Sequence, residues 1–439
     1  MREMKNSGIE WIGEMPSHWK VSAIKNYCKN VFAGGTPQSN NAEYWDGDIP
    51  WIPSGSCHDC KIISAPKYIT EIGLENSSTK MIPANTAVVA MTGATCGNTG
   101  YLTFDSCANQ SVTAYVAKDS SYPLFIWYLI QAAKEHLLTF QTGGAQGGVN
   151  VENCKNIIVP YISYDEQKRI ADYLDEKCAK IDAAIEKQKQ VIEKLKEYKL
   201  SVITEAVTKG LDPTVPMKDS GVEWIGEIPE GWKVAKLSNL FDFLGGYAFN
   251  SDLYTSESNN LVVRIGNVKN DKLLIDANPV YISDELARQV GKFKLKSQDI
   301  VFTMTGTKGK RDYFYTKLLD ESDISKKDLY LNQRVGCFRA KENIYAKYYC
   351  YLLKEPRILD SVFLYETGTA NQGNLGIDSI GRTRVHMPSY EEQIEIAEYL
   401  HQKCSEIDSA ISKKQAIVEK LAEYKKSLIY EVVTGKREV

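Results

Sequence analysis

The chain contains two copies of one unit, and this repeat constrains its fold more than any other feature of the sequence. Residues 5–21 (KNSGIEWIGEMPSHWKV) and 218–234 (KDSGVEWIGEIPEGWKV), which we call the preambles, are identical at 12 of 17 positions. Residues 164–208 and 390–434 are identical at 25 of 45 positions. A repeat of this length predicts two equivalent bodies, each built from a preamble, a globular region and a long helix.

Short landmarks occur in the same order between the preamble and the long segment of each copy. The rest of the globular regions has diverged, whereas the preambles and long segments have not. Similar preambles and long segments around dissimilar globular regions indicate two binding sites of one kind that recognise different ligands or sequences. Duplication with neutral drift is the alternative, although drift would also have eroded the long segments. The landmarks pair Gly34-Gly35 with Gly245-Gly246, Met91-Thr92-Gly93 with Met304-Thr305-Gly306, Asn109-Gln110 with Asn332-Gln333, and Thr142-Gly143 with Thr367-Gly368.

Both long segments carry a heptad seam of apolar residues, which is the signature of helices packed as a coiled coil. Gln188 and Lys199 interrupt the first seam, and Lys414 and Lys425 interrupt the second at equivalent positions. Polar residues in a seam fix the register of the pairing at a cost in stability. The seam residues are Leu174, Cys178, Ile181, Ile185, Ile192, Leu195, Val202 and Ala206 in the first copy, and Leu400, Cys404, Ile407, Ile411, Val418, Leu421, Leu428 and Val432 in the second.

Each helix is roughly 66 Å long, because its residues, about 44 in number, rise 1.5 Å each. Neither helix can expose its apolar stripe to water, and a pseudo-two-fold relation would pair the two antiparallel. Asp212–Pro216 ends the first helix, because proline cannot continue one. The first helix leads into the second preamble. If the second helix likewise ends beside the first preamble, the arrangement is cyclic. Met1 and Val439 are then predicted to lie close together.

Composition excludes several classes of protein. With 25% charged and 43% hydrophobic residues among 439, the chain is an ordinary globular one. Its net charge of -3 means that any nucleic-acid surface has to be local. No apolar run approaches the ~18 residues of a membrane span, and the N-terminus lacks the apolar stretch of a secretory signal. The ten scattered cysteines indicate reduced thiols, so a cytoplasmic location is expected.

The globular regions, residues 28–160 and 236–388, are predicted to be rich in strands and loops. Short β-branched or aromatic runs bounded by Gly, Asn or Pro predict strands, and apolar runs of helical length predict two helical stretches. The landmarks fall on polar, glycine-rich loops that allow close approach to a ligand. The predicted strands include 86–90, 112–116, 261–265 and 298–303, and the predicted helical stretches are 123–139 and 345–360.

The loops contain side chains that suit DNA recognition. Asn and Gln can pair with adenine in the major groove, and Arg or Lys with guanine. Lys308, Lys310 and Arg311 form the densest basic loop and are predicted to hold phosphate. A single loop of this kind is more often only a tight turn, but recurrence at the same place in both copies favours binding. The candidate DNA-binding residues are Thr36, Ser54, Ser56, Thr92, Thr95, Asn98, Gln146, Tyr247, Arg264, Asn267, Thr305, Lys308, Lys310, Arg311, Asn371 and Gln372.

No catalytic signature is present in the sequence. It has no Gly-x-Gly-x-x-Gly after a strand, no Walker loop, and no Pro-Pro-Tyr run of the amino-methyltransferase type; Asn278–Tyr281 lacks the second proline. Cys57-His58-Asp59-Cys60 offers one Cys pair, whereas structural zinc takes four ligands, and the second copy has no counterpart. We therefore predict neither catalytic residues nor a metal site.

In duplicate, these motifs resemble the specificity subunits of type I restriction–modification systems, and the resemblance covers essentially the whole chain. It rests on Glu10–Glu14 and Glu223–Glu227 (both EWIGE), on residues 34–52, on Met91–Thr95, and on the pairs Glu166-Gln167 and Glu392-Gln393 that open the helices.

The resemblance implies two target recognition domains, each reading one half of a split site in double-stranded DNA. The helices would act as a spacer and dock two modification subunits, which carry S-adenosylmethionine and methylate adenine. Restriction subunits would join to cut DNA. This chain would then hold no cofactor and supply no catalysis. The second copy has Gly245–Phe249 (GGYAF) in place of GGTP, so the two domains are expected to read different half-sites.

The predicted fold is of the α+β class: two mixed α/β target recognition domains alternate with two long helices that pack as an antiparallel coiled coil with cyclic pseudo-two-fold symmetry. Two other classes of protein stay open from the residues alone: a two-domain enzyme with an unrecognised site, and a coiled-coil scaffold that binds only protein. The predicted boundaries are 1–163 for the first preamble and domain, 164–208 for the first helix, 209–389 for the linker, second preamble and domain, and 390–439 for the second helix.

Overall fold

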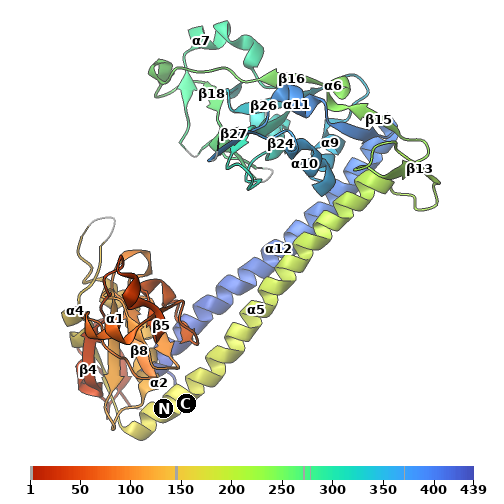
Figure 1. The fold of residues 1–439 in the computed structure, drawn as a ribbon. Helices are drawn as coiled ribbons and strands as arrows, with labels where there is room; N and C mark the ends of the chain where they lie inside the picture. The colour runs from red at the N-terminus through yellow and green to blue at the C-terminus, as the bar shows by residue number, and fades with distance from the viewer. Residues whose placement is uncertain (1–2, 144–146, 270–271, 277, 370) are drawn as a thin grey trace. The chain divides into compact units, whose positions relative to one another are not determined.

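The computed structural model describes residues 3–143, 147–269, 272–276, 278–369 and 371–439 (Figure 1). They form two compact units, Met1–Gln190 with Lys414–Val439 (unit 1) and Val191–Lys413 (unit 2). Helix α5 (Tyr164–Lys209) begins in unit 1 and ends in unit 2, whereas helix α12 (Tyr390–Val433) begins in unit 2 and ends in unit 1. Helix α5 extends the repeated segment 164–208 by one residue, whereas α12 ends at Val433, one residue before the end of the segment 390–434 and six before the predicted boundary at 439.

The first globular domain is built on a five-stranded sheet with the order β4-β11-β8-β9-β6. Its strand β8 (Thr86–Ala90, TAVVA) is buried at every residue because both faces of the sheet are covered. Ala87 and Val89 face the core formed with the helices, whereas Val88 and Ala90 face a second core on the other side. Side chains alternate between faces along a strand, so one apolar run serves both cores.

The remaining elements of unit 1 form three smaller sheets, β10-β5-β7, β12-β3 and β1-β2, and several short helices. Their bounds, with those of the main sheet, are β1 (Met4–Asn6), β2 (Glu14–Pro16), β3 (Lys20–Ala23), η1 (Ile24–Tyr27), β4 (Cys28–Ala33), η2 (Ala42–Tyr44), β5 (Trp45–Ile52), η3 (Ser54–Ser56), β6 (Cys60–Ile62), β7 (Lys67–Ile69), α1 (Glu71–Glu75), η4 (Gly93–Thr95), β9 (Thr99–Leu102), β10 (Cys107–Ala108), β11 (Val112–Ala117), α2 (Pro123–Ala132), α3 (Lys134–Leu138), α4 (Val151–Asn156) and β12 (Ile158–Tyr161).

The second globular domain has a main sheet with the corresponding strand order, β16-β26-β22-β24. Strand β22 (Ile300–Thr303) again divides its side chains, with Ile300 and Phe302 in the core beside the helices and Val301 in the core beyond the sheet. The order β25-β18-β21 likewise corresponds to β10-β5-β7, including one parallel and one antiparallel pairing in each. The fold has therefore been retained in regions whose sequences have diverged.

The elements of unit 2 also include the small sheets β17-β21-β18-β25, β15-β29, β13-β14, β19-β20 and β23-β28-β27. Their bounds are β13 (Met217–Asp219), β14 (Glu227–Pro229), β15 (Lys233–Lys236), α6 (Leu237–Leu240), β16 (Phe241–Gly245), η5 (Ser251–Leu253), β17 (Tyr254–Thr255), β18 (Asn260–Val263), η6 (Ile265–Asn267), β19 (Val268–Lys269), β20 (Lys272–Leu273), β21 (Tyr281–Ile282), α7 (Asp284–Gln289), η7 (Gly291–Phe293), β23 (Thr305–Gly306), β24 (Thr316–Leu318), α8 (Glu321–Ile324), β25 (Asp328–Leu331), β26 (Val335–Ala340), α9 (Ala346–Leu352), α10 (Pro356–Phe363), β27 (Thr367–Thr369), β28 (Gln372–Asn374), α11 (Ile377–Gly381) and β29 (Arg384–Met387).

Most predicted short elements are confirmed, but the predicted helical stretch 123–139 divides into α2 and α3 at Ala133, and the predicted strand 298–303 begins at Ile300. Three further differences have local causes. The predicted strand 261–265 ends at Val263, because the Asn267 side chain accepts the Arg264 backbone N–H at 2.8 Å and turns the chain into η6. The predicted helix 345–360 divides into α9 and α10, since Pro356 starts a new helix rather than continuing the first. The predicted loop 367–374 is a hairpin of β27 and β28.

Each long helix is joined to its preamble through a capping glutamate. The Trp19 indole donates to Glu166 Oε1 at 3.1 Å, and the Trp232 indole donates to Glu392 Oε1 at 3.2 Å. The Glu166 and Glu392 backbone N–H groups donate to Ser163 and Ser389. Ser with Glu three residues later is the capping-box pattern, so the residues that are most alike between the copies form the joint between preamble and helix.

A buried glutamine follows each capping glutamate and ties the helix to the globular domain. Gln167 accepts the Tyr122 backbone N–H at 2.9 Å and donates to the Ile162 carbonyl at 3.0 Å. Gln393 makes the equivalent bonds to Tyr345 and Pro388 at 2.9 and 3.1 Å. Both glutamines are almost inaccessible to water. A buried amide that is satisfied at both ends holds its partners in one arrangement, because breaking either bond strands a polar group.

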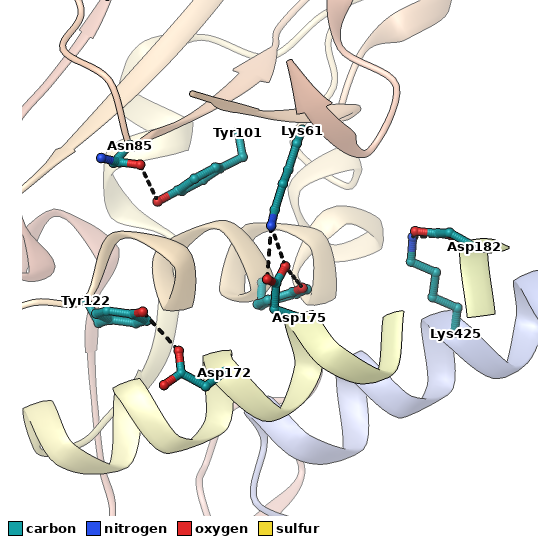
Figure 2. A network of polar contacts seen from close by, with 9 residues as sticks. Lys61, Asn85, Tyr101, Tyr122, Asp172, Asp175, Asp182 and Lys425 are labelled. Carbon is teal, nitrogen blue, oxygen red and sulfur yellow. Dashed lines mark hydrogen bonds and ion pairs between the residues drawn. The ribbon is translucent and has the colours of Figure 1, made fainter. Parts of the chain in front are cut away.

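Further along α5, a polar network holds the first domain against the helix (Figure 2). Tyr122 donates to Asp172 at 2.9 Å, and Lys61 reaches Asp175 at 2.8 Å. In unit 2, Tyr345 and Lys347 both contact Glu398, the residue that corresponds to Asp172, at 3.0 Å. Each domain is thus attached to the first turns of the helix that follows it in the chain.

Within each unit, the two helices lie side by side and run in opposite directions (Figure 1). In unit 1, Leu174 and Cys178 of α5 share a core with Leu428 and Val432 of α12. In unit 2, Ile203, Val207, Leu400 and Cys404 share the equivalent core. The predicted antiparallel seam is confirmed in both units.

Two lysines of the seam, Lys199 and Lys425, form ion pairs between the two helices. Lys425 lies 2.7 Å from Asp182 in unit 1, and Lys199 lies 2.7 Å from Asp408 in unit 2. The two pairs are equivalent, since an offset of 226 residues relates Asp182 to Asp408 and Lys199 to Lys425. Two of the four predicted interruptions, Lys199 and Lys425, are therefore matched by a carboxylate on the facing helix. Gln188 and Lys414 have no such partner among the described residues, and the Gln188 Oε1 atom is buried without a hydrogen bond.

The end of α12 packs on the first preamble, as the cyclic arrangement predicts. The Tyr430 hydroxyl donates to the Ile12 carbonyl at 3.4 Å, and Val439 packs against the same core as Trp11. Gly435 has a φ of +74°, and an added Cβ would meet Pro16 at 2.4 Å, so only glycine fits there. Met1, on which the prediction about the chain ends falls, lies outside the described residues.

Among the described residues, no helix has both the length and the apolar character needed to cross a membrane. The chain's ten cysteines are all free thiols, and most of them are buried.

We expect the Lys425–Asp182 pair to contribute to the helix pairing of unit 1. In a double-mutant cycle of K425A and D182A, the coupling energy should be about 0.5–1 kcal/mol, the upper range for accessible ion pairs, because Lys425 is mostly buried. Urea unfolding of the full chain measures it. The exposed pair Lys180–Glu176 on α5 is the matched control and should show a smaller coupling. A coupling of zero for Lys425–Asp182 would contradict a role in register.

Candidate nucleic-acid interface

In unit 1, the first two landmark loops pack directly on one another. Gly35 N–H donates to the Ala108 carbonyl at 2.8 Å, and an added Cβ on Gly34 would lie 2.1 Å from that oxygen. Thr36 then donates from its hydroxyl to Gln110. Glycine is needed at Gly34 because two backbones meet there. The exposed hydroxyl of Thr36 is thereby held beside the Asn-Gln landmark.

The other two landmark loops of unit 1 continue from this contact. Met91 N–H donates to the Ser111 carbonyl at 2.7 Å, and Val149 N–H donates to the Met91 carbonyl at 2.9 Å. Thr92 forms a β-bridge with Gly148. Four loops that are distant in sequence therefore form one contiguous edge of the domain. We call it the first loop rim: residues 34–37, 91–95, 109–111, 142–143 and 147–148.

Unit 2 places its four landmark loops in the same way. Tyr247 N–H donates to the Leu331 carbonyl at 2.8 Å, Met304 N–H to Arg334 at 3.0 Å, and Leu375 N–H to Met304 at 2.9 Å. Thr305 pairs with Asn374, as Thr92 does with Gly148. This second loop rim comprises residues 245–247, 304–311, 332–334, 367–369 and 371–374. The landmarks that recur in the sequence are thus the positions where loops meet.

The second loop rim carries a concentration of positive charge that its counterpart lacks. Lys308, Lys310 and Arg311 are all exposed, and Lys308 donates to the Gly368 carbonyl at 3.0 Å. The contact sets the basic loop against the hairpin that presents Asn371 and Gln372, which are also exposed. Arg311 forms an ion pair with Asp360 and lies over the Phe363 ring. Predicted phosphate-binding and base-reading side chains are therefore brought together.

Glu366 organises this loop and was not predicted from the sequence. Its carboxylate accepts the Gly309 N–H at 3.1 Å and the Tyr313 hydroxyl at 2.7 Å. Burial, followed by the hydrogen bond to Glu366, raises the pKa of Tyr313. A single acidic residue in a diverged region gives no signal; its only hint is its place directly before the Thr367-Gly368 landmark.

Several candidate residues have structural partners. Asn98 accepts the Lys134 ammonium at 2.7 Å, which directs its amide toward α3. Asn267 is buried and bonds the backbone of Arg264 and Leu274. Arg264 donates to the Asn278 carbonyl at 2.6 Å. In this structure these three side chains hold their own turns.

The other candidates differ in exposure. Ser54, Ser56 and Thr95 are half-buried. Ser54 and Ser56 lie in η3, which follows Ile52, and the Ile52 carbonyl accepts the Asn109 N–H at 3.0 Å. Tyr247 is 37% exposed and packs on Phe249 and Phe293. Gln146 lies outside the described residues.

No group of three or more His, Cys, Asp or Glu side chains suited to a metal ion occurs in the described part of the chain. Cys57 is buried in the core behind the main sheet, and Asp59 is bonded to Thr99 and Lys134. Both rims instead present exposed hydroxyl and amide groups, and the second rim adds basic groups. Such surfaces are suited to hydrogen bonding with an extended polar ligand.

The family comparison agrees with this architecture. The model of the "Type I restriction modification DNA specificity domain" matches residues 16–196 and 229–419. The chain belongs to the family of type I restriction–modification specificity subunits. Each matched region contains one loop rim and most of the helix that follows it, so the family's repeated domain coincides with the internal repeat.

Curated relatives extend the match over nearly the whole chain. The MjaVIII specificity subunit of Methanocaldococcus jannaschii is 26% identical over 427 residues, covering 96% of this chain and 93% of the relative. The MjaIX specificity subunit of the same organism is 27% identical over 309 residues, covering 67% and 68%. A chain from a structure entitled "Structural basis underlying complex assembly and conformational transition of the type I R-M system" superposes with a TM-score of 0.71 at 13% identity, covering 96% of this chain and 99% of that one. This last likeness confirms the fold.

Replacing Glu366 should loosen the basic loop of the second rim. E366A removes the acceptor of the Gly309 N–H and the Tyr313 hydroxyl, so amide exchange at residues 307–313 should accelerate by roughly ten- to a hundredfold, as expected for the loss of bonds to a charged acceptor. Hydrogen-exchange mass spectrometry measures it. E342A, at an exposed glutamate of the same unit, is the matched control. Equal protection in both variants would show that Glu366 does not hold the loop.

Proposed function

We propose that the chain recognises a two-part sequence in double-stranded DNA, with one half-site read by each loop rim. The observation that carries this proposal is the pair of equivalent rims whose backbones match and whose side chains differ. The first rim presents Thr36 and Thr92, whereas the second presents Lys308, Lys310 and Tyr247. Identical scaffolds with unlike polar side chains suit two different half-sites. Membership in the specificity family supports the same assignment.

We further propose that the chain supplies recognition without catalysis. Its sequence has no methyltransferase, nuclease or nucleotide-binding motif, and its curated relatives are specificity subunits. Methyl transfer from S-adenosylmethionine would belong to two partner modification subunits, and cleavage to restriction subunits in a full complex. An enzyme with an unrecognised site remains the rival, and methyl transfer by the purified chain without a partner would favour it.

The outer faces of the helices support docking of two copies of one partner. Tyr198 on α5 and its equivalent Tyr424 on α12 are 57% and 47% exposed. An exposed tyrosine contributes little to the packing of its own helix, so its retention in both copies favours a common partner. Exposed aromatic residues of this kind are enriched at the energetic centres of interfaces. We therefore assign Tyr198 and Tyr424 to the two modification-subunit contacts.

The helices also suit a spacer role. α5 spans 46 residues and contributes to both units, so its uninterrupted length, ~69 Å at 1.5 Å per residue, is available as a rigid element. The equivalent ion pairs Lys425–Asp182 and Lys199–Asp408 restrict sliding of one helix against the other. A fixed register would translate into a fixed gap between half-sites.

DNA binding should depend on the basic loop of the second rim. K310A and R311A should each weaken binding of the full chain, and if the side chains hold phosphate, the loss is uniform over sequences and the salt slope falls by about one per contact. If Arg311 reads guanine, the loss is about 1–3 kcal/mol and confined to the second half-site. Fluorescence anisotropy across a salt series distinguishes these cases. The matched control is K194A, on the outer face of α5; equal behaviour of all three variants would remove the loop from the interface and favour a protein-only scaffold.

Partner stoichiometry should depend on the two tyrosines. Y198A and Y424A are each expected to remove one modification subunit from the assembly, and the double variant should lose both, because truncating an interface aromatic weakens binding roughly tenfold or more. Native mass spectrometry with the cognate modification subunit counts the bound copies. Y68A, at a similarly exposed tyrosine of the first domain, is the control. Two bound copies in the double variant would place docking elsewhere.

A further inference from the structure

Unit 1 contains a cavity of about 690 Å³ at the inner corner between the first globular domain and the two helices. Its walls come from α2 and α3, from α5 near Asp182, from α12 near Tyr430, and from Trp11 of the preamble. The volume falls in the range of small-molecule sites, roughly 300–1,000 Å³. None of the lining residues belongs to a loop rim, so the cavity is separate from the proposed DNA interface.

One part of the cavity is aromatic and apolar. The Trp11 and His136 rings are stacked, with 6.2 Å between their centroids and 21° between their planes. Tyr430 and Ile429 line the α12 side, and Ile185 lines the α5 side. Flat aromatic faces beside aliphatic side chains are the surroundings in which a planar ring buries the most surface.

The carboxylates that line the cavity are largely engaged by neighbours. Asp59 accepts from the Thr99 backbone at 2.7 Å and from Lys134 at 3.0 Å. Asp182 receives Lys425 on both oxygens at 2.7 Å. Glu135 is the remaining acid of the lining, and it is exposed. A cationic ligand would therefore have to compete with ion pairs that already exist.

Three donors of the lining, by contrast, have no acceptor among the described residues. The Gln131 side-chain nitrogen is buried and has no acceptor among the described residues. Lys189 and Lys426 line the cavity and make no hydrogen bond or ion pair with the described part of the chain. A buried donor without an acceptor is costly. The exposed ammonium groups of Lys189 and Lys426 add positive charge to the same lining. These groups suit a ligand that is rich in acceptors and negatively charged.

The second copy shows that the fold does not require these donors. Unit 2 has a cavity of about 510 Å³ at the corresponding corner, which includes Lys199, the equivalent of Lys425. Leu200 stands where the first copy has Lys426, and Gln415 where it has Lys189. No histidine lines that cavity. The two lysines and His136 are therefore additions to unit 1 rather than parts of the shared scaffold.

We propose that the unit 1 cavity binds a small molecule that joins a planar aromatic ring to an anionic group, as a purine nucleotide or an aromatic carboxylate does. The ring lies against Trp11, His136 and Tyr430, and the anion lies between Lys189 and Lys426. Gln131 donates to an acceptor on the ring. Because the cavity is lined by the domain and both helices, an occupant stabilises unit 1 by mass action.

Isothermal titration calorimetry on the full chain tests the proposal with adenosine monophosphate and indole-3-acetate. Adenosine, which lacks the anion, and inorganic phosphate, which lacks the ring, are the half-ligand controls. At least one of the two complete compounds should bind, and the half-ligands should bind at least tenfold more weakly. Binding of only the nucleotide or only the carboxylate identifies the source of the ligand, and both outcomes support the site.

Variants locate the binding. K426L and K189Q introduce the residues that the second copy carries, so they are compatible with the helix pair, and each should raise the Kd roughly tenfold, as expected for loss of a charged hydrogen bond. K187Q, at an exposed lysine of α5 outside the cavity, is the matched control. Binding of neither compound, or equal affinity of all three variants, overturns the proposal. DNA binding measured on the same samples shows that the variants are folded and is expected to be unchanged.

Discussion

The attachment of each globular domain to the helix that follows it depends on one buried glutamine. Gln167 and Gln393 each bond two backbone groups, one at the start of a domain helix and one just before the long helix. Without these side chains, a buried N–H and a buried carbonyl in each unit would lose their partners, at a cost of about 1–3 kcal/mol per group. The neighbouring Trp–Glu bonds extend the same joint to the preamble. A domain fixed in this way points its loop rim in a direction that the helix determines.

Charged residues fix the register of the helix pair, which the apolar seam alone does not determine. Leucine, isoleucine and cysteine side chains pack acceptably in more than one register, because hydrophobic contact is not directional. Lys199 and Lys425 are tolerated in the seam only where a carboxylate faces them. A slip of one helical turn would leave both lysines without partners in both units at once. The register is therefore selected mainly by the penalty on the alternatives, even though each accessible ion pair contributes little stability.

The parts of the fold that could be predicted from the sequence are those in which a local pattern repeats. The long helices and their pairing followed from the periodicity of the seam and from the repeat of residues 164–208 in 390–434. Contacts between distant segments could not be predicted. No pattern in the sequence indicates the β-bridge between Thr92 and Gly148, or the hydrogen bond from the Gly309 N–H to Glu366. Asn267 illustrates a different limit, because an amide on a glycine-containing turn suits base recognition and turn capping equally well, and only its burial decides between them.

The loop rims also explain how two copies could diverge while their folds stayed alike. The contacts that assemble each rim are mainly backbone hydrogen bonds, such as Gly35 to Ala108 and Met304 to Arg334. Backbone groups are common to almost all residues, so most rim side chains can change without loss of the assembly, and the glycines are retained where two backbones approach closely. Glu366 is an exception, because its side-chain carboxylate, rather than a backbone group, holds the basic loop. The first rim has no such loop and needs no equivalent. Under the proposed function, side-chain atoms of the rims would carry recognition while their backbone atoms hold the fold, so specificity could vary on a constant scaffold.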